Sequence, residues 1–535
     1  MRRLISILAA LAVVATVGFV ALRDTTPPTT LRIVAGSENQ ALEPLVQAWA
    51  AQNNVTVDIS YLGSVDISRS LSAGKQSDFD AVWPAHSLWI ELGDTQKVVA
   101  HTESILRSPV VLGLRKSLAQ KLGWIGRDDV TVQMIEQAAQ SGAFRLSMTS
   151  ATQSNSGASA YLGFLYALAG NPDILTLDTL ADPKLQSDMR ALLGTVDRSS
   201  GSSGWLKDSL VANPTAFDAM INYESVIIEA NQALTTQDQE PLYIIYPANG
   251  MAVADSPLGL INKSDPAKET AFLALQAYLL TPASQDKLSA LGRRTGLLGL
   301  SSEGADPAVW NKGWGIDLTR DIAPIPTPAS DVIAEALSLY QSELRKPSLT
   351  IWVLDVSGSM EGAPLAQLKA AMELLLDPET AAVSLLQPSR RDITILLPFN
   401  HAPQEPTIVT GATPADLAAA LTRVQGLKAE GGTDLYAAIG TAVDLLAPYA
   451  ENGTLNDYLP AIVAMTDGAS ETINREWMQA RIDDSGFARD IPIHSIAFGA
   501  ADEDQLKALS TASIGRLFKA GDDIAAALRG AKGYN

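Results

Sequence analysis

The sequence predicts an α/β protein in which two folded units follow one another. Short apolar stretches that suit buried strands alternate with helical stretches from Leu31 to the end of the chain. The 535 residues are enough for two or three globular domains, and 47% of them are hydrophobic, which allows large cores. Glycine and proline are scattered, so neither a fibrous repeat nor a disordered chain is indicated.

The charge balance and the lack of cysteine exclude several classes of function. The net charge of −20 disfavours nucleic acid and anionic lipid, because both are bound by clustered Lys and Arg. With no cysteine, the chain forms no disulfide, no thiolate nucleophile and no zinc–thiolate site. Because of the net charge, we expect no nucleic-acid partner.

Residues 1–30 are expected to be a membrane anchor, or a signal, followed by a short stem. Two arginines precede an uncharged run from Leu4 to Leu22, which is long enough to span a bilayer. Its end lacks the small residues of a signal cleavage site, so an uncleaved single-pass helix is favoured. The arginine pair predicts a cytoplasmic N-terminus and an extracytoplasmic ectodomain, in the periplasm or at the cell surface. The Thr- and Pro-rich residues 25–30 are typical of a stiff stem.

Residues 31–300 form the first predicted unit. A strand, a helix and a second strand follow one another between Leu31 and Ile59, which is the order of a largely parallel sheet. Two unbroken apolar strands, Pro109–Leu114 and Leu242–Ile245, lie far apart in sequence. In a two-lobed fold they are the candidates for the crossings between the lobes.

Short motifs spread over this unit resemble bacterial extracellular solute-binding proteins of the molybdate and sulfate type. The motifs are Ile33–Glu38, Gly63-Ser64, Asp78–Val82, Tyr223–Ser225, Pro247, Asp255–Pro257 and Gly292–Gly296. The resemblance implies a two-lobed, periplasmic-binding-protein-like fold with a solute cleft. Proteins of this kind hold an anion with hydroxyls and with backbone amides at helix starts, where the helix dipole favours negative charge.

The candidate solute ligands are polar residues in these motifs and next to predicted helix starts. They are Ser37, Ser64, Ser154, Asn155, Ser156 and Tyr223. Ser and Asn at helix starts are also ordinary N-caps, so capping without ligand contact stays an open alternative. Glu38 and Glu224 depart from an oxyanion site, because a carboxylate opposes anion binding. The occupant of the cleft therefore stays open between an anion, a cationic or organic solute, and none.

Residues 301–347 are predicted to be a connector that packs against the folded units rather than a loose tether. The segment is rich in proline and then becomes helical from Asp331 to Leu344. Its large apolar side chains require burial. They are Trp310, Trp314, Leu337 and Tyr340.

Residues 348–535 are predicted to form a doubly wound α/β domain. The expected strands are Leu349–Leu354, Ile393–Leu397, Ala461–Met465 and Ile493–Phe498, and the expected helices are Leu365–Leu376, Pro414–Val424, Leu435–Leu446, Asp502–Ser510 and Asp522–Leu528. The end of the first strand is followed by polar residues, and ligand sites of open α/β sheets lie at such carboxyl ends.

A metal site is predicted there. Asp355, Ser357 and Ser359 stand at alternate positions of an extended turn, so one carboxylate and two hydroxyls converge. Asp467 follows another strand, and Thr433 follows two glycines at a helix start. Five hard oxygen donors suit Mg²⁺ best, with Mn²⁺ or Ca²⁺ as alternatives, and disfavour zinc. Taken alone, the first three residues are also compatible with a helix cap or an Asx turn.

These five residues resemble the metal-ion-dependent adhesion site of von Willebrand factor A domains and match all five positions of that pattern. The resemblance implies a Rossmann-like domain that binds an acidic side chain of a protein partner through the ion and is not an enzyme. In agreement, none of the four histidines stands in a nucleophile or zinc arrangement. His494 is expected to be a buried core residue, and Asp434 is a neighbouring carboxylate without an assigned role.

Together these features predict a membrane-anchored extracytoplasmic binding protein. Its C-terminal domain binds a divalent cation and an acidic partner, and its N-terminal domain binds or senses a small solute or serves as a scaffold. One alternative is the receptor of a transport system with an accessory docking domain. Another is metal-dependent hydrolysis or a helper role for a separate ATPase, since the chain has no Gly-x-x-x-x-Gly-Lys loop of its own.

Overall fold

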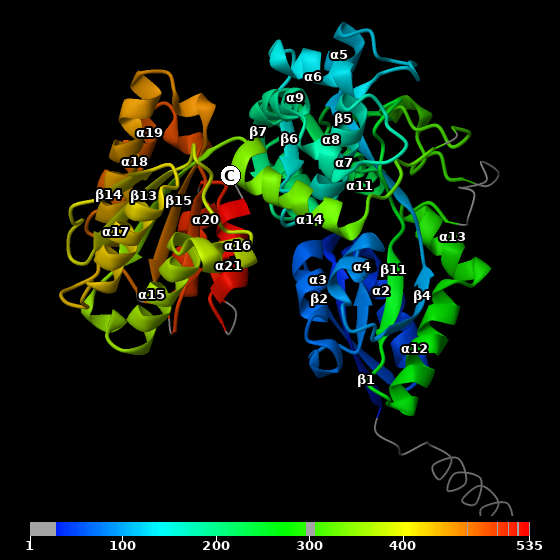
Figure 1. Cartoon of the computed structure of the whole chain (residues 1–535), viewed down its shortest axis with the longest axis horizontal. Coiled ribbons are helices and arrows are strands. Elements are labelled where there is room, and N and C mark those ends of the chain that lie inside the picture. Colours follow the sequence, from blue (N-terminus) through cyan, green and yellow to red (C-terminus); the bar gives the residue numbers. More distant parts are fainter. Residues whose placement is uncertain are drawn as a thin grey trace, which may run out of the picture.

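The computed structural model describes residues 28–295, 305–320, 322–467, 469–499, 501–511, 513–521 and 524–533. The predicted membrane helix lies outside these ranges. Among the helices that are described, none has the length and apolar character needed to span a bilayer. The described chain forms two lobes, a connector and a C-terminal domain (Figure 1).

Lobe 1 is built on a five-stranded sheet of order β2-β1-β3-β11-β4. Its strands are β1 (Thr29–Gly36), β2 (Val55–Leu62), β3 (Ala81–Trp83), β4 (Val99–Ser104) and β11 (Pro257–Ile261). Its helices are η1 (Ser37–Leu42), α2 (Glu43–Gln52), α3 (Ser64–Leu71), η2 (Gly74–Gln76), α4 (Leu88–Gly93), α12 (Pro266–Leu279) and α13 (Pro282–Ala290). β1 is parallel to β2 and β3, whereas β11 is antiparallel to β3 and β4. The sheet is therefore mixed, because β11 enters it from lobe 2 in the reverse direction.

Lobe 2 contains a six-stranded sheet of order β10-β5-β8-β6-β7, with β9 paired to β5. Its strands are β5 (Ser108–Arg115), β6 (Leu146–Thr149), β7 (Val196–Ser200), β8 (Ala219–Tyr223), β9 (Leu242–Ile245) and β10 (Val253–Ala254). Its helices are α5 (Lys116–Lys121), α6 (Val132–Gln140), α7 (Asn155–Leu168), α8 (Leu177–Leu180), α9 (Pro183–Gly194), α10 (Ser203–Ala212), η3 (Pro214–Ala216) and α11 (Glu224–Thr236). α7 is buried over nearly its whole length because small and apolar residues occupy all of its faces.

The chain crosses between the lobes at Ile105–Arg107, between β4 and β5, and at Asp255–Ser256, between β10 and β11. The prediction that Pro109–Leu114 and Leu242–Ile245 form the crossings is wrong. Both segments lie inside the sheet of lobe 2, where β5 and β9 pair antiparallel. Their unbroken apolar composition reflects burial within that sheet.

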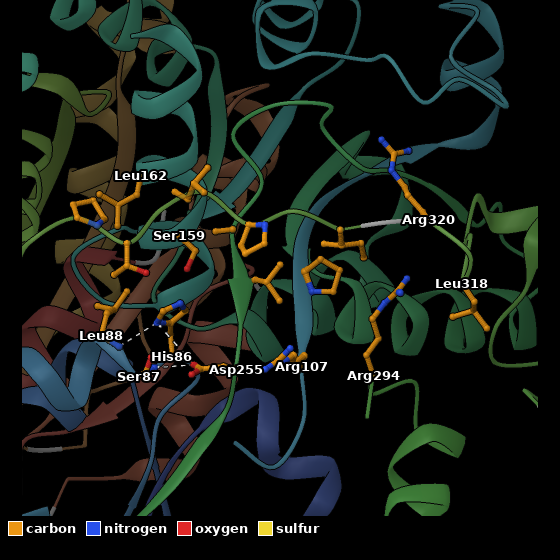
Figure 2. A pocket seen from close by; sticks show the side chains of 18 of the residues that line it. His86, Ser87, Leu88, Arg107, Ser159, Leu162, Asp255, Arg294, Leu318 and Arg320 are labelled. Carbon is orange, nitrogen blue, oxygen red and sulfur yellow. Dashed lines mark hydrogen bonds and ion pairs between the residues drawn. The ribbon is translucent and has the colours of Figure 1, made fainter. Parts of the chain in front are cut away.

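A cavity of about 620 Å³ lies beside these crossings (Figure 2). Arg107, Asp255 and Arg294 line it together with the connector residues that follow Leu318. Its charged groups have partners: Asp255 accepts a hydrogen bond of 2.8 Å from the Ser87 N–H, and Arg294 forms an ion pair within the protein. The cavity is a gap at the hinge that the sequence did not predict.

The connector packs on lobe 2, as expected. Its elements are η4 (Lys312–Trp314), α14 (Ser330–Leu339) and the π turn η5 (Tyr340–Leu344). All four large apolar side chains that were predicted to need burial are buried. The ring of Tyr340 lies edge-on to Tyr161 of α7, with 5.2 Å between the ring centroids, and the Tyr161 hydroxyl donates to the Ala336 carbonyl at 2.9 Å. These contacts fix α14 against α7.

The C-terminal domain has a six-stranded sheet of order β14-β13-β12-β15-β16-β17. Its strands are β12 (Ser348–Asp355), β13 (Ile393–Phe399), β14 (Thr407–Thr410), β15 (Leu459–Thr466), β16 (Ile493–Ala497) and β17 (Leu517–Lys519). Its helices are η6 (Gly358–Met360), α15 (Ala363–Leu376), α16 (Pro378–Val383), α17 (Pro414–Gln425), α18 (Leu435–Glu451), η7 (Leu455–Asp457), α19 (Arg475–Asp484), η8 (Ala488–Asp490), α20 (Glu503–Thr511) and α21 (Ile524–Gly533). Every neighbouring pair is parallel except β13 with β14.

The side chains of β12 alternate between two hydrophobic cores. Ile351 and Val353 pack with α18 and α19 on one face, while Trp352 and Leu354 pack with α15, α17 and α21 on the other. Helices on both faces of a mainly parallel sheet make this the doubly wound domain that was predicted.

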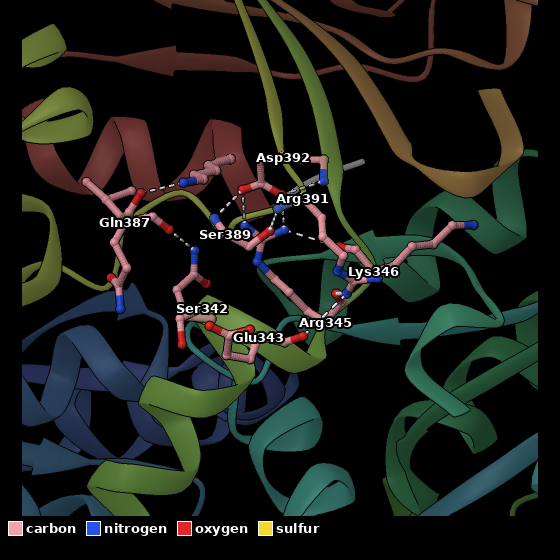
Figure 3. A network of polar contacts seen from close by, with 12 residues as sticks. Ser342, Glu343, Arg345, Lys346, Gln387, Ser389, Arg391 and Asp392 are labelled. Atoms are coloured by element: carbon pink, nitrogen blue, oxygen red, sulfur yellow. Dashed lines mark hydrogen bonds and ion pairs between the residues drawn. The ribbon is translucent and has the colours of Figure 1, made fainter. Parts of the chain in front are cut away.

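A buried ion pair joins the connector to the C-terminal domain (Figure 3). Arg345 donates from Nη1 to Asp392 Oδ1 at 3.0 Å and from Nη2 to Oδ2. Asp392 also accepts from the backbone N–H groups of Ser348 and Ser389, each at 2.8 Å. Burial raises the pKa of Asp392, but the charges of Arg345 and Lys532 and these hydrogen bonds outweigh burial and lower the pKa to about 2.

Asp392→Asn is expected to lower the free energy of unfolding by roughly 3 to 5 kcal/mol, because it leaves the Arg345 guanidinium buried without its counter-charge. Chemical denaturation followed by fluorescence measures this loss. The control is Glu343→Gln, which removes an exposed pair with Arg390 and should change stability by less than about 1 kcal/mol. Equal losses in the free energy of unfolding would show that the buried pair stabilises the protein no more than the exposed pair does.

Candidate metal site and solute cleft

The carboxyl edge of the C-terminal sheet brings four of the five predicted metal ligands together. β12 and β15 are neighbouring parallel strands, so Asp355 at the end of β12 and Asp467 just after β15 reach the same edge. Asp355 and Ser357 are fully buried, whereas Ser359 is exposed and Asp467 is half-buried. The candidate site therefore extends from the buried side chains of Asp355 and Ser357 to the protein surface at Ser359.

A continuous set of hydrogen bonds connects four of the five predicted residues. The Ser357 N–H donates to Asp355 Oδ1 at 2.8 Å, and the hydroxyls of Ser357 and Ser359 lie 3.1 Å apart. Ser359 Oγ donates to Asp467 Oδ1 at 2.8 Å. Thr466, which sequence reasoning missed, donates a hydrogen bond from its hydroxyl to Asp355 Oδ2. This bond links the end of β15, next to Asp467, directly to Asp355. The position of Thr466 as the last residue of β15, beside Asp467, was the available signal.

The loop that carries Thr433 packs on this turn through backbone contacts. The Gly358 N–H donates to the Gly431 carbonyl at 2.9 Å, and the Thr433 carbonyl accepts from the Glu471 N–H at 3.0 Å. Gly431 has φ +81°, a conformation that favours glycine, and a Cβ there would lie 2.9 Å from His401 Nδ1. His401 and Glu471 therefore flank the glycines beside Thr433. Sequence reasoning assigned neither of them to the site.

Asp434 and His494 have structural roles. Asp434 caps α18, because its Oδ1 accepts from the Ala437 N–H at 2.9 Å, and its Oδ2 accepts from Asn474. His494 is fully buried in β16, where its Nδ1 accepts from the Arg516 N–H at 3.0 Å. The prediction of a satisfied core histidine is confirmed.

The donors at this edge fit a divalent cation that prefers oxygen. Burial raises the pKa of Asp355, and the carboxylate of Asp467 raises it further, against the hydrogen bonds from Ser357 and Thr466. A cation between the two carboxylates would favour their charged forms. Among the described residues no three His, Asp or Glu side chains cluster as a metal site. Hydroxyls and water would therefore complete the shell, as Mg²⁺ accepts.

The six predicted solute ligands also converge. Ser37, Ser64 and Ser154 line a cavity of about 340 Å³ between the lobes. Asn155, Ser156 and Tyr223 lie fully buried. Asn155 donates to the Tyr223 hydroxyl at 2.9 Å and accepts from the Trp89 indole at 2.7 Å, which links lobe 2 to lobe 1. The first three residues are therefore candidates for ligand contact, and the other three support them.

Helix starts surround this cavity, but the predicted serines do not cap them. The helices α3 and α7 begin at Ser64 and Asn155, and neither start has a side-chain cap. The Ser154 hydroxyl instead lies 3.1 Å from that of Ser203 at the start of α10. Ser37 accepts a hydrogen bond of 3.1 Å from Ser202, so lobe 1 and lobe 2 also touch here. The capping alternative does not account for these hydroxyls, because Ser37 and Ser154 contact other serine hydroxyls of the cleft instead.

The two glutamates that argued against an anion site have different surroundings: Glu224 forms an ion pair, and Glu38 has a raised pKa. Glu224 is fully buried in a two-bond ion pair with Arg294, at 2.7 and 2.8 Å, so its charge is balanced. Glu38 lines the cavity and its carboxylate folds back over Gly36, where a Cβ would collide with it. Burial raises the pKa of Glu38 to about 7, against a backbone hydrogen bond and the charge of Arg293. Glu38 is therefore substantially protonated near neutral pH.

Glu38→Gln is expected to change how stability depends on pH. Because burial raises the pKa of Glu38 from 4.5 to about 7, wild type loses stability as the pH rises from about 4.5 to about 7, where the carboxyl of the unfolded chain ionises while the buried one stays protonated. The loss is complete above about pH 7. The loss relative to Glu38→Gln should be roughly 2 to 3 kcal/mol. Denaturant unfolding of both proteins across this pH range measures it. Parallel pH profiles would contradict the assignment.

Two family profiles match the chain. Residues 31–294 match bacterial extracellular solute-binding protein, and residues 350–469 match von Willebrand factor type A domain. No curated protein sequence matches. These matches follow the order of modules that the motifs predicted.

Several solved structures are similar to the solute-binding half. Periplasmic binding protein AfuA of Actinobacillus pleuropneumoniae, with fructose-6-phosphate bound, is 11% identical over 59% of this chain and 98% of its own, with a TM-score of 0.44. Iron-bound HitA of Pseudomonas aeruginosa is 13% identical over 58% and 98%, with a TM-score of 0.42. The sulfate-binding protein SubI of Mycobacterium tuberculosis H37Rv is 19% identical over 56% and 93%, with a TM-score of 0.37.

Proposed function

Because the chain joins a bacterial extracellular solute-binding domain to a von Willebrand factor type A domain, we propose that it is an extracytoplasmic binding protein with two sites. The C-terminal domain binds a divalent cation, Mg²⁺ in the first place, and through it an acidic side chain of a protein partner. The N-terminal domain binds a small anionic solute in the interlobe cleft. The apolar segment near the N-terminus anchors the protein in the membrane, and both functions are binding rather than catalysis.

The connected contacts of Asp355, Ser357, Ser359 and Asp467 are the observation that carries this proposal. They place two carboxylates and two hydroxyls at the carboxyl edge of a parallel sheet, where ligands of open α/β folds bind. Thr433 stands on the loop that packs against them. Oxygen donors without sulfur or imidazole suit Mg²⁺, Mn²⁺ or Ca²⁺.

The exposure of the site supports docking of a partner. Ser359 is exposed and Asp467 is half-buried, so the ion would face solvent on one side. The hydroxyl ligands carry no charge and leave the cation able to attract a further carboxylate. A partner's Asp or Glu side chain is the group that this chemistry favours.

Asp355→Ala is expected to abolish binding of Mg²⁺ and Mn²⁺, with a loss of more than about 100-fold in affinity, since outer-shell changes alone cost up to that amount. Isothermal titration calorimetry of the full chain measures the affinity, and circular dichroism checks the fold. Asp444→Asn is the control, because Asp444 pairs only at the surface of α18 with Arg481. An unchanged affinity of Asp355→Ala for Mg²⁺ and Mn²⁺ would contradict the proposed metal site.

Solute binding is tested with molybdate, sulfate and phosphate as probes. Wild type is expected to bind at least one of them, and Ser154→Ala to weaken that binding by about tenfold or more, the usual loss of a hydrogen bond to a charged group. Ser159→Ala is the matched control: Ser159 is a buried serine one turn further along α7 and outside this cleft. Absence of binding by wild type would contradict the anionic solute.

A further inference from the structure

We propose that Arg516 of the C-terminal domain is a ligand-binding residue of the interlobe cleft, so that both domains hold the anionic solute. The inference rests on the solute-binding function proposed above and names the cationic contact of that site. It also makes solute binding depend on the docking of one domain against the other.

Arg516 lines the same cavity as Ser37, Ser64 and Ser154. Its guanidinium lies 5.7 Å from the ring centroid of Trp205 in α10, and Trp205 lines the cavity too. A guanidinium stacked on an aromatic ring keeps its N–H groups at the edge of the plane, where they can donate to an anion. The geometry therefore places a cation in the lining of the cleft.

Arg516 is the sole cationic side chain among the described residues that line this cavity. The acidic lining residues are Glu38 and Asp208. Burial raises the pKa of Glu38 to about 7, and Asp208 pairs with Lys207 at 3.2 Å. Both features reduce the negative charge that these two carboxylates bring to the cleft. An anion in the cleft would meet hydroxyls and helix starts from the two lobes, and the guanidinium of Arg516 from the C-terminal domain.

The backbone at Arg516 is fixed by the sheet of its own domain. Arg516 stands directly before β17, which pairs with β16. Its N–H donates to the buried His494 ring at 3.0 Å, and its carbonyl accepts from the Ser495 N–H at 2.9 Å. The side chain therefore extends from a rigid sheet edge toward Trp205.

The C-terminal domain also contacts both rims of the cleft through one residue of α21. Arg529 Nε lies 2.8 Å from Asp66 Oδ1 in α3, the helix that begins at Ser64. The Arg529 carbonyl accepts from the side chain of Gln153, the neighbour of Ser154. One residue thus spans lobe 1 and lobe 2 beside the candidate ligands. Opening the lobes would break one of these contacts, which couples closure of the cleft to domain docking.

Titration calorimetry tests the proposal with whichever of molybdate, sulfate and phosphate binds wild type most tightly. Arg516→Ala and Arg516→Gln are both expected to weaken binding by about tenfold or more, as for loss of a charge-assisted hydrogen bond. Arg489→Ala is the control: it removes an exposed arginine of the same domain that pairs with Asp483. Its affinity for the anion should equal that of wild type.

Thermal unfolding separates a ligand contact from a role in folding. Without anion, Arg516→Gln and wild type should unfold at the same temperature, and the anion should raise that temperature less in the variant. Wild-type affinity in both Arg516 variants would overturn this inference and leave the solute proposal intact. Failure of wild type to bind any of the three anions would instead overturn the solute proposal itself.

Discussion

Both candidate sites depend on the parallel pairing of strands that are distant in sequence. β12 and β15 are parallel neighbours, so the residues that follow them, Ser357 and Asp467, reach one edge of the sheet. In lobe 1 the parallel strands β1 and β2 deliver Ser37 and Ser64 to the cleft in the same manner. Because carboxyl ends of parallel strands lie side by side, side chains from separate segments share one site without any special loop.

Three buried carboxylates, Asp392, Glu224 and Glu38, differ in the groups that surround them and therefore in their charge. Asp392 keeps its charge because Arg345 and backbone N–H groups surround it, and it ties the connector to the C-terminal domain. Glu224 is paired with Arg294 and adds no net charge near the cleft. Glu38 has no such pair, and burial raises its pKa to about 7. An acidic chain can therefore still present a cleft that suits an anion.

The topology places the two proposed binding events at opposite ends of one sheet. The proposed metal ligands lie at the carboxyl ends of β12 and β15, while Arg516 precedes the amino end of β17. A partner that docks on the ion would approach from the edge far from the solute cleft. The sheet order β12-β15-β16-β17 nevertheless connects the two regions through paired strands.

The sequence by itself determined the fold class, the strands and helices around the proposed metal site, and most of the residues proposed for the two sites. Hydrophobic periodicity and strand ends are local properties, so Asp355, Ser357 and Ser359 could be placed at the end of a strand, and together with Thr433 and Asp467 they could be proposed as metal ligands. Only the tertiary structure showed that Thr466 completes the contacts of Asp355, that lobe 1 has a mixed sheet, and that Arg516 reaches the cleft. Those features depend on contacts between distant segments and on burial, which no local pattern encodes.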